Sequence, residues 1–444
     1  MTVVAPRTRI DLALPSDVAV VNLLPMLLKM AGESSPDGGT RHGGWCLAKL
    51  GGEVIDPDRP LAALGVVDGD LLQLRRRTDN PPPPLFDDVV EAIAATAPSS
   101  YRPWTERTAR TLGMVAGGLA LLGGAVALLR AGPGLGVAFL AGAAAVTALV
   151  VGSVIGRVYA ETNAGVLVAA ASLPLGFVSG LYIVPGSVGS ENLLLACTLT
   201  LVLASASIMV LGAGITPFVA TATAAALGAL AFLVASLVDR PGAGIAAGAA
   251  ALALGAISAL PRLTIQLSRL PMPKVPSSAQ DLQEDAGLPN YTAIERRSGL
   301  AHEYLTGMIM GAGAVAAIGA VLAAAGGTLG VLLGAVVAAV LLLRARSYAN
   351  GSQAIALLVS GMAAVGGMMA GLMATADQAV LLLVGFGGLL VVATFALIAG
   401  LVLPRRRFSP VARRAVDVME AVLIAAVLPL ALGVMDLYNT FRAL

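Results

Sequence analysis

From residue 112 to residue 437 the sequence consists of apolar runs long enough to cross a bilayer, with hardly a charged residue inside them. A transmembrane helix needs about 20 predominantly apolar residues to cross roughly 30 Å of hydrocarbon. We therefore expect eleven spans, at 112–129, 135–156, 163–184, 193–213, 217–238, 241–261, 304–324, 327–343, 353–374, 378–403 and 415–437. The polar segment 262–303 separates spans one to six (112–261) from spans seven to eleven (304–437).

The first 80 residues follow a different pattern. Residues 8–14 alternate between polar and apolar, as in a half-buried strand, and residues 2–5 form a short apolar run before them. Residues 21–31 instead place apolar side chains at helical spacing after the helix-start cluster Pro15-Ser16-Asp17. In this helix Pro25 is expected in the first turn, where its missing N–H costs little. We also expect strands at 45–50, 53–55 and 71–75, and a single helical turn at 61–64.

This order of strands and helices resembles the ubiquitin-like β-grasp, an α+β fold. The helix-start cluster Pro15-Ser16-Asp17 and the Gly51-Gly52 turn before a short strand also resemble ubiquitin. The resemblance ends at Leu74-Arg75, which continues into Arg76 and Arg77 rather than into a terminal di-glycine. Residues 1–80 are therefore predicted to form a cytoplasmic docking domain without conjugation chemistry.

A linker over residues 81–111 follows the head. Its four prolines, residues 81–84, predict a stiff polyproline segment. Apolar residues at 86, 89, 90 and 93 then lie on one side of a short amphipathic helix. Trp104, among Arg102, Arg107 and Arg110, is typical of an interfacial aromatic residue beside a cytoplasmic basic flank.

Composition supports the membrane interpretation. Hydrophobic residues make up 57% of the chain and charged residues 12%, whereas soluble proteins carry about 25% charged residues. The first 20 residues contain charges and prolines but no apolar core of a signal peptide, so the head is expected to stay where it is synthesised. Cys46 lies in the soluble part and Cys197 in an apolar run, so no disulfide is expected.

The placement of basic residues predicts the orientation of the spans, because cytoplasmic loops are enriched in Lys and Arg. The side of the N-terminus carries sixteen of them: Arg102, Arg107, Arg110, Arg157, Arg262, Arg269, Lys274, Arg296, Arg297, Arg344, Arg346, Arg405, Arg406, Arg407, Arg413 and Arg414. The opposite side carries three: Arg130, Arg240 and Arg442. We expect a plasma (inner) membrane protein with a cytoplasmic N-terminus and an extracytoplasmic tail, residues 438–444.

Motifs for catalysis are missing from the sequence. None of its three lysines lies in a Gly-x-x-x-x-Gly-Lys-Ser/Thr loop, so no P-loop ATPase site is expected. His302-Glu303 has no second histidine at helical spacing, which excludes a zinc hydrolase motif. Basic stretches such as 404–408 fit topology and anionic lipid better than nucleic acid. We therefore predict no catalytic, cofactor-binding or metal site, no cofactor, no nucleic-acid partner and no enzymatic activity.

The spans also lack ionisable residues near their midpoints. Arg130, Asp239, Asp417 and Glu420 are all expected at or close to span ends. This argues against proton-coupled transport, although sodium coupling through backbone and hydroxyl oxygens stays open. Glycines instead recur at four-residue spacing, a pattern that allows helices to approach closely. The pairs are Gly113/Gly117, Gly307/Gly311, Gly330/Gly334 and Gly367/Gly371.

The insert 262–303 is too long for a simple helix connection, and its prolines exclude one continuous helix. It is expected to contact a partner, with a merely solvated loop as the alternative. The insert contains the sequence Leu-Pro-Met-Pro-Lys-Val-Pro at 270–276.

A β-grasp head, a Pro-rich linker, eleven Gly/Ala-rich spans divided six plus five, and this proline sequence together resemble the EccD family of ESX (type VII) secretion systems. The resemblance implies a non-catalytic subunit of an inner-membrane complex with EccB, the ATPase EccC and EccE. It also implies a dimer that frames a membrane vestibule. The rival hypothesis is a secondary transporter of a small solute with an added docking domain. Helix breaks at mid-depth would favour the transporter, and Pro174 and Pro217 are the candidates.

Overall fold

The computed structural model describes residues 1–6, 8–32, 44–49, 54–67, 69–76, 104–212, 214–238, 240–270, 291–401 and 409–438. Its contacts divide the chain into two units, Met1–Trp104 and Thr105–Leu444. The expected amphipathic helix at 86–93, residues 271–276 of the proline sequence and the basic stretch 404–408 lie outside the described residues.

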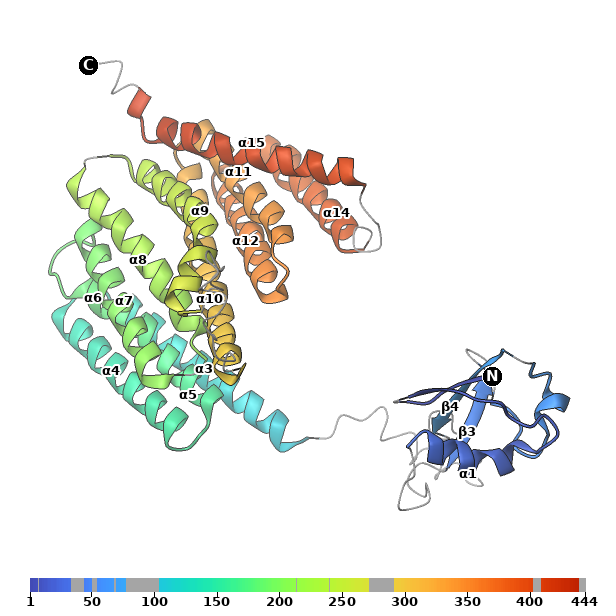
Figure 1. The fold of residues 1–444 in the computed structure, drawn as a ribbon. Helices are drawn as coiled ribbons and strands as arrows, with labels where there is room; N and C mark the ends of the chain where they lie inside the picture. Colours follow the sequence, from blue (N-terminus) through green and yellow to red (C-terminus); the bar gives the residue numbers. More distant parts are fainter. Residues whose placement is uncertain are drawn as a thin grey trace, which may run out of the picture. The chain divides into compact units, whose positions relative to one another are not determined.

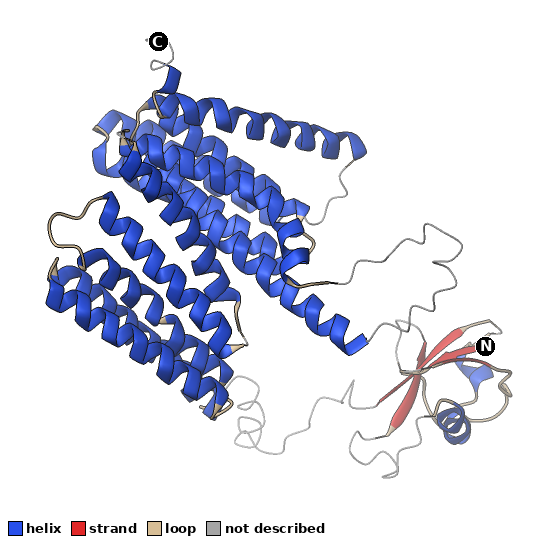
Figure 2. Cartoon of the chain, turned by 60° about the vertical axis from the view of Figure 1, so that its left-hand side comes forward, coloured by secondary structure: helices blue, strands red, loops and turns tan. Residues whose placement is uncertain are grey.

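Among its described residues, the first unit contains a four-stranded sheet and one α-helix (Figures 1 and 2). Its elements are β1 (Thr2–Val4), β2 (Arg9–Asp11), α1 (Val20–Met30), β3 (Trp45–Lys49), the 3-10 helix η2 (Leu61–Leu64) and β4 (Leu71–Arg76). The strand order is β2-β1-β4-β3, and β1 runs parallel to β4 while the other pairs are antiparallel. Leu27 of α1 is fully buried and belongs to the same core cluster as the sheet residues Val3 and Leu72.

Two details of the head differ from the sequence prediction. The expected strand at 53–55 is described only as a single bridge between Ala48 and Val54. Pro25 lies inside α1 rather than in its first turn. Ala19 is extended and bridged to Pro60, so the helix begins at Val20 and Pro25 falls in the second turn. There, its missing N–H removes one helical hydrogen bond.

The second unit is a bundle of helices. Ten helices among the described residues are long and apolar enough to cross a membrane. They are α3 (Glu106–Ala131), α4 (Leu135–Arg157), α5 with α6 (Thr162–Ala170, Ser172–Tyr182), α7 (Ser190–Leu211), α8 (Thr216–Leu237), α9 (Gly242–Leu267), α10 (Tyr291–Ala324), α11 (Thr328–Arg344), α12 (Gly351–Thr375) and α15 (Pro410–Val434). Each coincides with one predicted span. The remaining predicted span, 378–403, contains α13 (Gln378–Val380), the π-helical η5 (Leu381–Phe386) and α14 (Gly387–Leu401) in direct succession.

Several helices extend beyond the apolar runs that predicted them. Helix α9 continues through Pro261 to Leu267, and α10 begins at Tyr291, so both ends of the expected 262–303 insert are helical. Helix α15 begins at Pro410, before the predicted start at 415. Hydropathy locates the part of a helix that suits hydrocarbon, whereas backbone hydrogen bonding continues into polar sequence, so the two boundaries need not coincide.

Glycine contacts are selective. A Cβ on Gly307 would lie 2.7 Å from the carbonyl oxygen of Thr216, and one on Gly311 would overlap the Ala220 carbonyl, so these glycines permit the close packing of α10 on α8. By contrast, Gly113 and Gly117 of α3 have no neighbouring atom within 4 Å of that position. Helix α10 packs against α8, α9, α11 and α12 and lies at the centre of the bundle (Figure 1).

Candidate functional site

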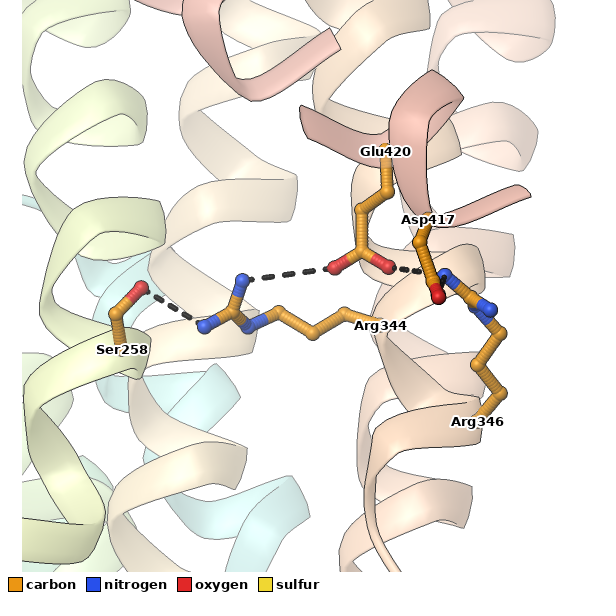
Figure 3. Close-up of polar contacts among 5 residues, drawn as sticks. All are labelled: Ser258, Arg344, Arg346, Asp417 and Glu420. Carbon is orange, nitrogen blue, oxygen red and sulfur yellow. Dashed lines mark hydrogen bonds and ion pairs between the residues drawn. The ribbon is translucent and has the colours of Figure 1, made fainter. Parts of the chain in front are cut away.

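A cluster of four charged side chains joins the end of α11 to α15 (Figure 3). Arg346 Nη2 lies 2.9 Å from Glu420 Oε2 and 2.7 Å from Asp417 Oδ1. Arg344 Nη1 lies 3.6 Å from the other oxygen of Glu420, and its Nη2 donates to Ser258 Oγ of α9 at 2.8 Å. We call these four charged residues the Arg–Glu cluster.

Local sequence explains the geometry of the Arg–Glu cluster. Arg344 is the last residue of α11, and Arg346 lies in the 3-10 helix η4 (Ala345–Ser347) that follows. Asp417 and Glu420 are three residues apart on α15 and therefore share one helix face. Glu420 belongs to the buried face of α15 that packs on α11 and α9.

Burial makes Glu420 the central member of the cluster. Its side chain is 11% exposed and that of Arg344 is 19% exposed, whereas Asp417 is 55% exposed. Two arginines balance two carboxylates, so the cluster brings no net charge into the bundle. Burial also raises the pKa of the nearby Tyr348 hydroxyl, while the positive charge of Arg344 and a hydrogen bond with it lower that pKa in part.

The sequence prediction placed Asp417 and Glu420 at or close to a span end and assigned them no role. The two carboxylates at i, i+3 spacing and the nearby Arg344 and Arg346 were visible in the sequence. The sequence did not reveal that α11 packs on α15. Helix α11 ends at Arg344 and α15 begins at Pro410, so the two are far apart along the chain. The predicted role of the arginines as topology signals and their observed ion pairs are compatible.

Other reactive side chains have structural contacts. Glu303 Oε2 accepts a 3.0 Å hydrogen bond from the backbone N–H of Ile215, immediately before α8. Cys46 and Cys197 are both buried free thiols. Within the described residues, no group of three or more His, Cys, Asp or Glu side chains could hold a metal ion. The polar contacts described above connect helices to one another.

Comparison with known proteins identifies the bundle. A family model described as the EccD-like transmembrane domain matches residues 109–444. The chain belongs to the EccD family. A second family model, described as the WXG100 protein secretion system (Wss) protein YukD, matches residues 1–74 and agrees with the ubiquitin-like interpretation of the head.

Individual EccD proteins match along most of the chain. The ESX-4 secretion system protein eccD4 of Mycobacterium tuberculosis (strain ATCC 25618 / H37Rv) is 29% identical over 460 aligned positions, covering 100% of this chain and 97% of the relative. The ESX-3 secretion system protein EccD3 of the same strain is 27% identical and covers 79% of this chain and 78% of the relative.

Solved structures share the fold. A chain in the structure of protomer 1 of the ESX-3 core complex matches with a TM-score of 0.64 at 21% identity, covering 99% of both chains. A chain of the MycP5-free ESX-5 inner membrane complex (State II) matches with a TM-score of 0.60 at 19% identity, covering 90% of this chain and 98% of that one. The predicted EccD resemblance is thus confirmed, as is a polytopic helical membrane protein with a ubiquitin-like head.

Proposed function

We propose that this EccD-family protein is a non-catalytic core membrane subunit of a type VII (ESX) secretion complex. The observation that carries the proposal is the eccD4 relative, a named ESX-4 secretion system protein that aligns with the entire chain, head included. The solved structures with the same fold are themselves named as core or inner membrane complexes. A subunit of such a complex needs a stable helical scaffold and surfaces for partners.

The contacts of the chain fit a scaffold. The buried charges of the Arg–Glu cluster are neutralised by one another, and Glu303 is engaged at the start of α8. A chemical step would need a nucleophile, a base or a bound cofactor held ready beside a substrate site. We therefore propose that another subunit supplies the energy for secretion.

The partners follow from the family. We propose that the membrane unit associates with EccB, the ATPase EccC and EccE, that it pairs with a second copy as a dimer, and that the head docks on cytoplasmic parts of these partners. Lipid covers the remaining apolar surface. Helix α3 offers a surface for contacts with partner subunits or lipid, because large apolar side chains such as Leu119 are widely exposed along it.

For the orientation, we propose a cytoplasmic N-terminus and an extracytoplasmic C-terminus. The sixteen-to-three distribution of basic residues supports it, and so does the position of Arg344 and Arg346 at one end of α11. An odd number of crossings then requires the 378–401 helix to count as a span.

The transporter hypothesis finds no support in the comparisons. One feature that it predicted does occur: the span Thr162–Tyr182 is interrupted at Ala171, three residues before Pro174. However, Ser172 Oγ donates to the Ala169 carbonyl there, and both residues are fully buried. The interruption is thus closed by protein contacts rather than open to a solute.

Purification of the tagged full-length chain in a mild detergent, followed by mass spectrometry, tests the proposal. We expect a large assembly that includes a subunit with several ATPase domains. A matched sample extracted from cells that express the untagged chain controls for background. A chain that purified alone and supported solute uptake in liposomes would contradict the secretion role.

A further inference from the structure

A groove of ≈ 720 Å³ runs along the bundle beside α10, between this helix and α12, with Thr216 of α8 at one end. Its walls are two regular stripes. Thr306, Met310 and Ala314 recur every four residues on α10, and Ile355 and Val359 lie four residues apart on α12. Residues at this spacing share one face of a helix, so the two stripes run side by side along the two helices.

The two ends of the groove differ in chemistry. At one end lie His302 and Glu303 of α10 and Asn350 and Ser352 of α12. Towards the other end the lining is mostly apolar, and it finishes at Ala314 and at Ser360, whose hydroxyl donates to the Ala356 carbonyl. There the helices converge, because a Cβ on Gly313 would lie only 2.6 Å from Ser360 Oγ. The groove is therefore closed at its deep end and open along its side.

The length of the groove fits one leaflet of a bilayer. From Asn350 to Ser360 the axis of α12 rises about 15 Å, at about 1.5 Å per residue. That is half of the roughly 30 Å of hydrocarbon in a membrane. Ile355 is 60% exposed, Val359 53% and Met310 42%, so the rim offers apolar contact to a flexible chain. A helix from another subunit would need a track across both leaflets.

The polar end fits a phosphate group. Helix α12 begins there, and the first turn of a helix presents unpaired N–H groups and the positive end of the helix dipole. Asn350 caps this turn by accepting from the Ser352 N–H at 3.0 Å. His302 lies across the groove, and the exposed Arg296 lies two turns farther out on α10, on the same face as Glu303. Glu303, the carboxylate at this end, is engaged by the Ile215 N–H. The polar end and the apolar track are therefore arranged like the two parts of a lipid.

We propose that this groove binds one phospholipid from the leaflet on the His302 side, with its phosphate at the start of α12 and one acyl chain along Ile355 and Val359. The site is a property of the single chain and does not depend on the secretion role. The bound lipid would fill the space between α10 and α12 that the side chains leave open, and so stabilise their spacing.

Photolabelling of the full-length chain tests this site. The chain is reconstituted in vesicles of phosphatidylethanolamine and phosphatidylglycerol that contain a phosphatidylglycerol with a diazirine in its acyl chain. We expect adducts on peptides that contain Met310 and Val359 to exceed those on the exposed residues of α3, which report bulk lipid. Equal labelling of groove and α3 would overturn the proposal.

Two pairs of variants separate specific binding from folding. Ser352→Asp puts a negative charge in the first turn of α12, where it favours the helix but repels a phosphate. Ser409→Asp makes the same change at the exposed N-cap of α15, where Asp also caps well. We expect Ser352→Asp to lower groove labelling about tenfold, as for loss of one hydrogen bond to a charged group. Ser409→Asp leaves it unchanged.

The second pair tests the acyl track. Val359→Trp fills the groove, whereas Met362→Trp enlarges an exposed side chain of α12 that does not line it. Only Val359→Trp should reduce the adducts at Met310. Groove labelling that stays unchanged in both Ser352→Asp and Val359→Trp would overturn the proposal. So would a disulfide between Ile355→Cys chains without lipid labelling, because a second copy would then occupy the groove.

Discussion

Glu420 of α15 accepts a 2.9 Å hydrogen bond from Arg346, which lies in the short helix after α11. The same carboxylate also faces Arg344, so a single buried side chain links α15 to the last residue of α11 and to η4. In the same half of α15, the apolar side chains of Val411 and Val418 are widely exposed. We infer that Glu420 sets the position of α15 against α11.

Removal of Glu420 is expected to destabilise the bundle. Glu420→Ala removes the carboxylate that pairs with both Arg344 and Arg346. Loss of one partner from a buried ion pair costs about 3–5 kcal/mol in the free energy of unfolding. Because Arg346 is 32% exposed, we expect a value of about 3 kcal/mol, at the lower end of that range. The measurement is the midpoint of thermal unfolding of the purified full-length chain in detergent.

Asp417→Ala is the matched control, because this carboxylate contacts the same arginine but is 55% exposed. Exposed ion pairs contribute about 0–1 kcal/mol, so its unfolding midpoint should stay close to that of the parent protein. Glu420→Ala combined with Arg346→Ala should cost less than the two single changes together. Equal effects of the Glu420 and Asp417 variants would show that burial does not govern the cluster.

Close packing of α8 on α10 should depend on Gly311. In Gly311→Ala the new methyl group would overlap the backbone carbonyl of Ala220, so the helices must move apart. We expect a lower unfolding midpoint, whereas Gly117→Ala, which has open space around it, should be neutral or slightly stabilising. Thermal unfolding of both variants checks this, and a loss of stability in Gly117→Ala alone would reverse the assignment.

The core of the head should depend on Leu27. Leu27→Ala removes a fully buried side chain and is expected to cost about 2–5 kcal/mol in the free energy of unfolding of this unit. Met26→Ala, next to it on α1 but 42% exposed, should have little effect. Hydrogen exchange in the full-length chain measures this through the amides of β1 and β4. Equal loss of protection in both variants would contradict the β-grasp core.

The proposed orientation can be tested with single cysteines in a chain whose Cys46 and Cys197 are replaced by alanine. A cysteine at Ser187, in the loop between α6 and α7, should react with an impermeant maleimide added to intact cells. A cysteine at Tyr159, between α4 and α5 and 70% exposed, should react only after the membrane is opened. The reverse pattern would invert the topology.

A reporter fused after Leu444 tests the number of crossings independently. The eleven predicted spans place this end outside the cytoplasm. Cytoplasmic activity of the reporter would mean that the helix from Gln378 to Leu401 does not cross the membrane. The result thus bears on one named segment rather than on the whole bundle.

Much of the architecture was readable from the sequence. Apolar runs of bilayer length predicted the ten long helices, because a span must hide its backbone polar groups within itself and needs enough apolar residues to cross hydrocarbon. Alternation in residues 8–14 and helical spacing in residues 21–31 likewise indicated the head. These are local requirements, so local sequence reveals them.

The tertiary structure decided which residues meet. Only the tertiary structure shows that Gly307 and Gly311 lie against another helix backbone whereas Gly113 and Gly117 do not. A small residue matters only where another backbone packs closely against it. The tertiary structure also joined Glu420 to Arg344 and Arg346 and opened the groove between α10 and α12. Each of these features requires helices distant in sequence to pack side by side, and hydrophobic periodicity in a membrane span does not specify its neighbours, because lipid is as apolar as a partner helix.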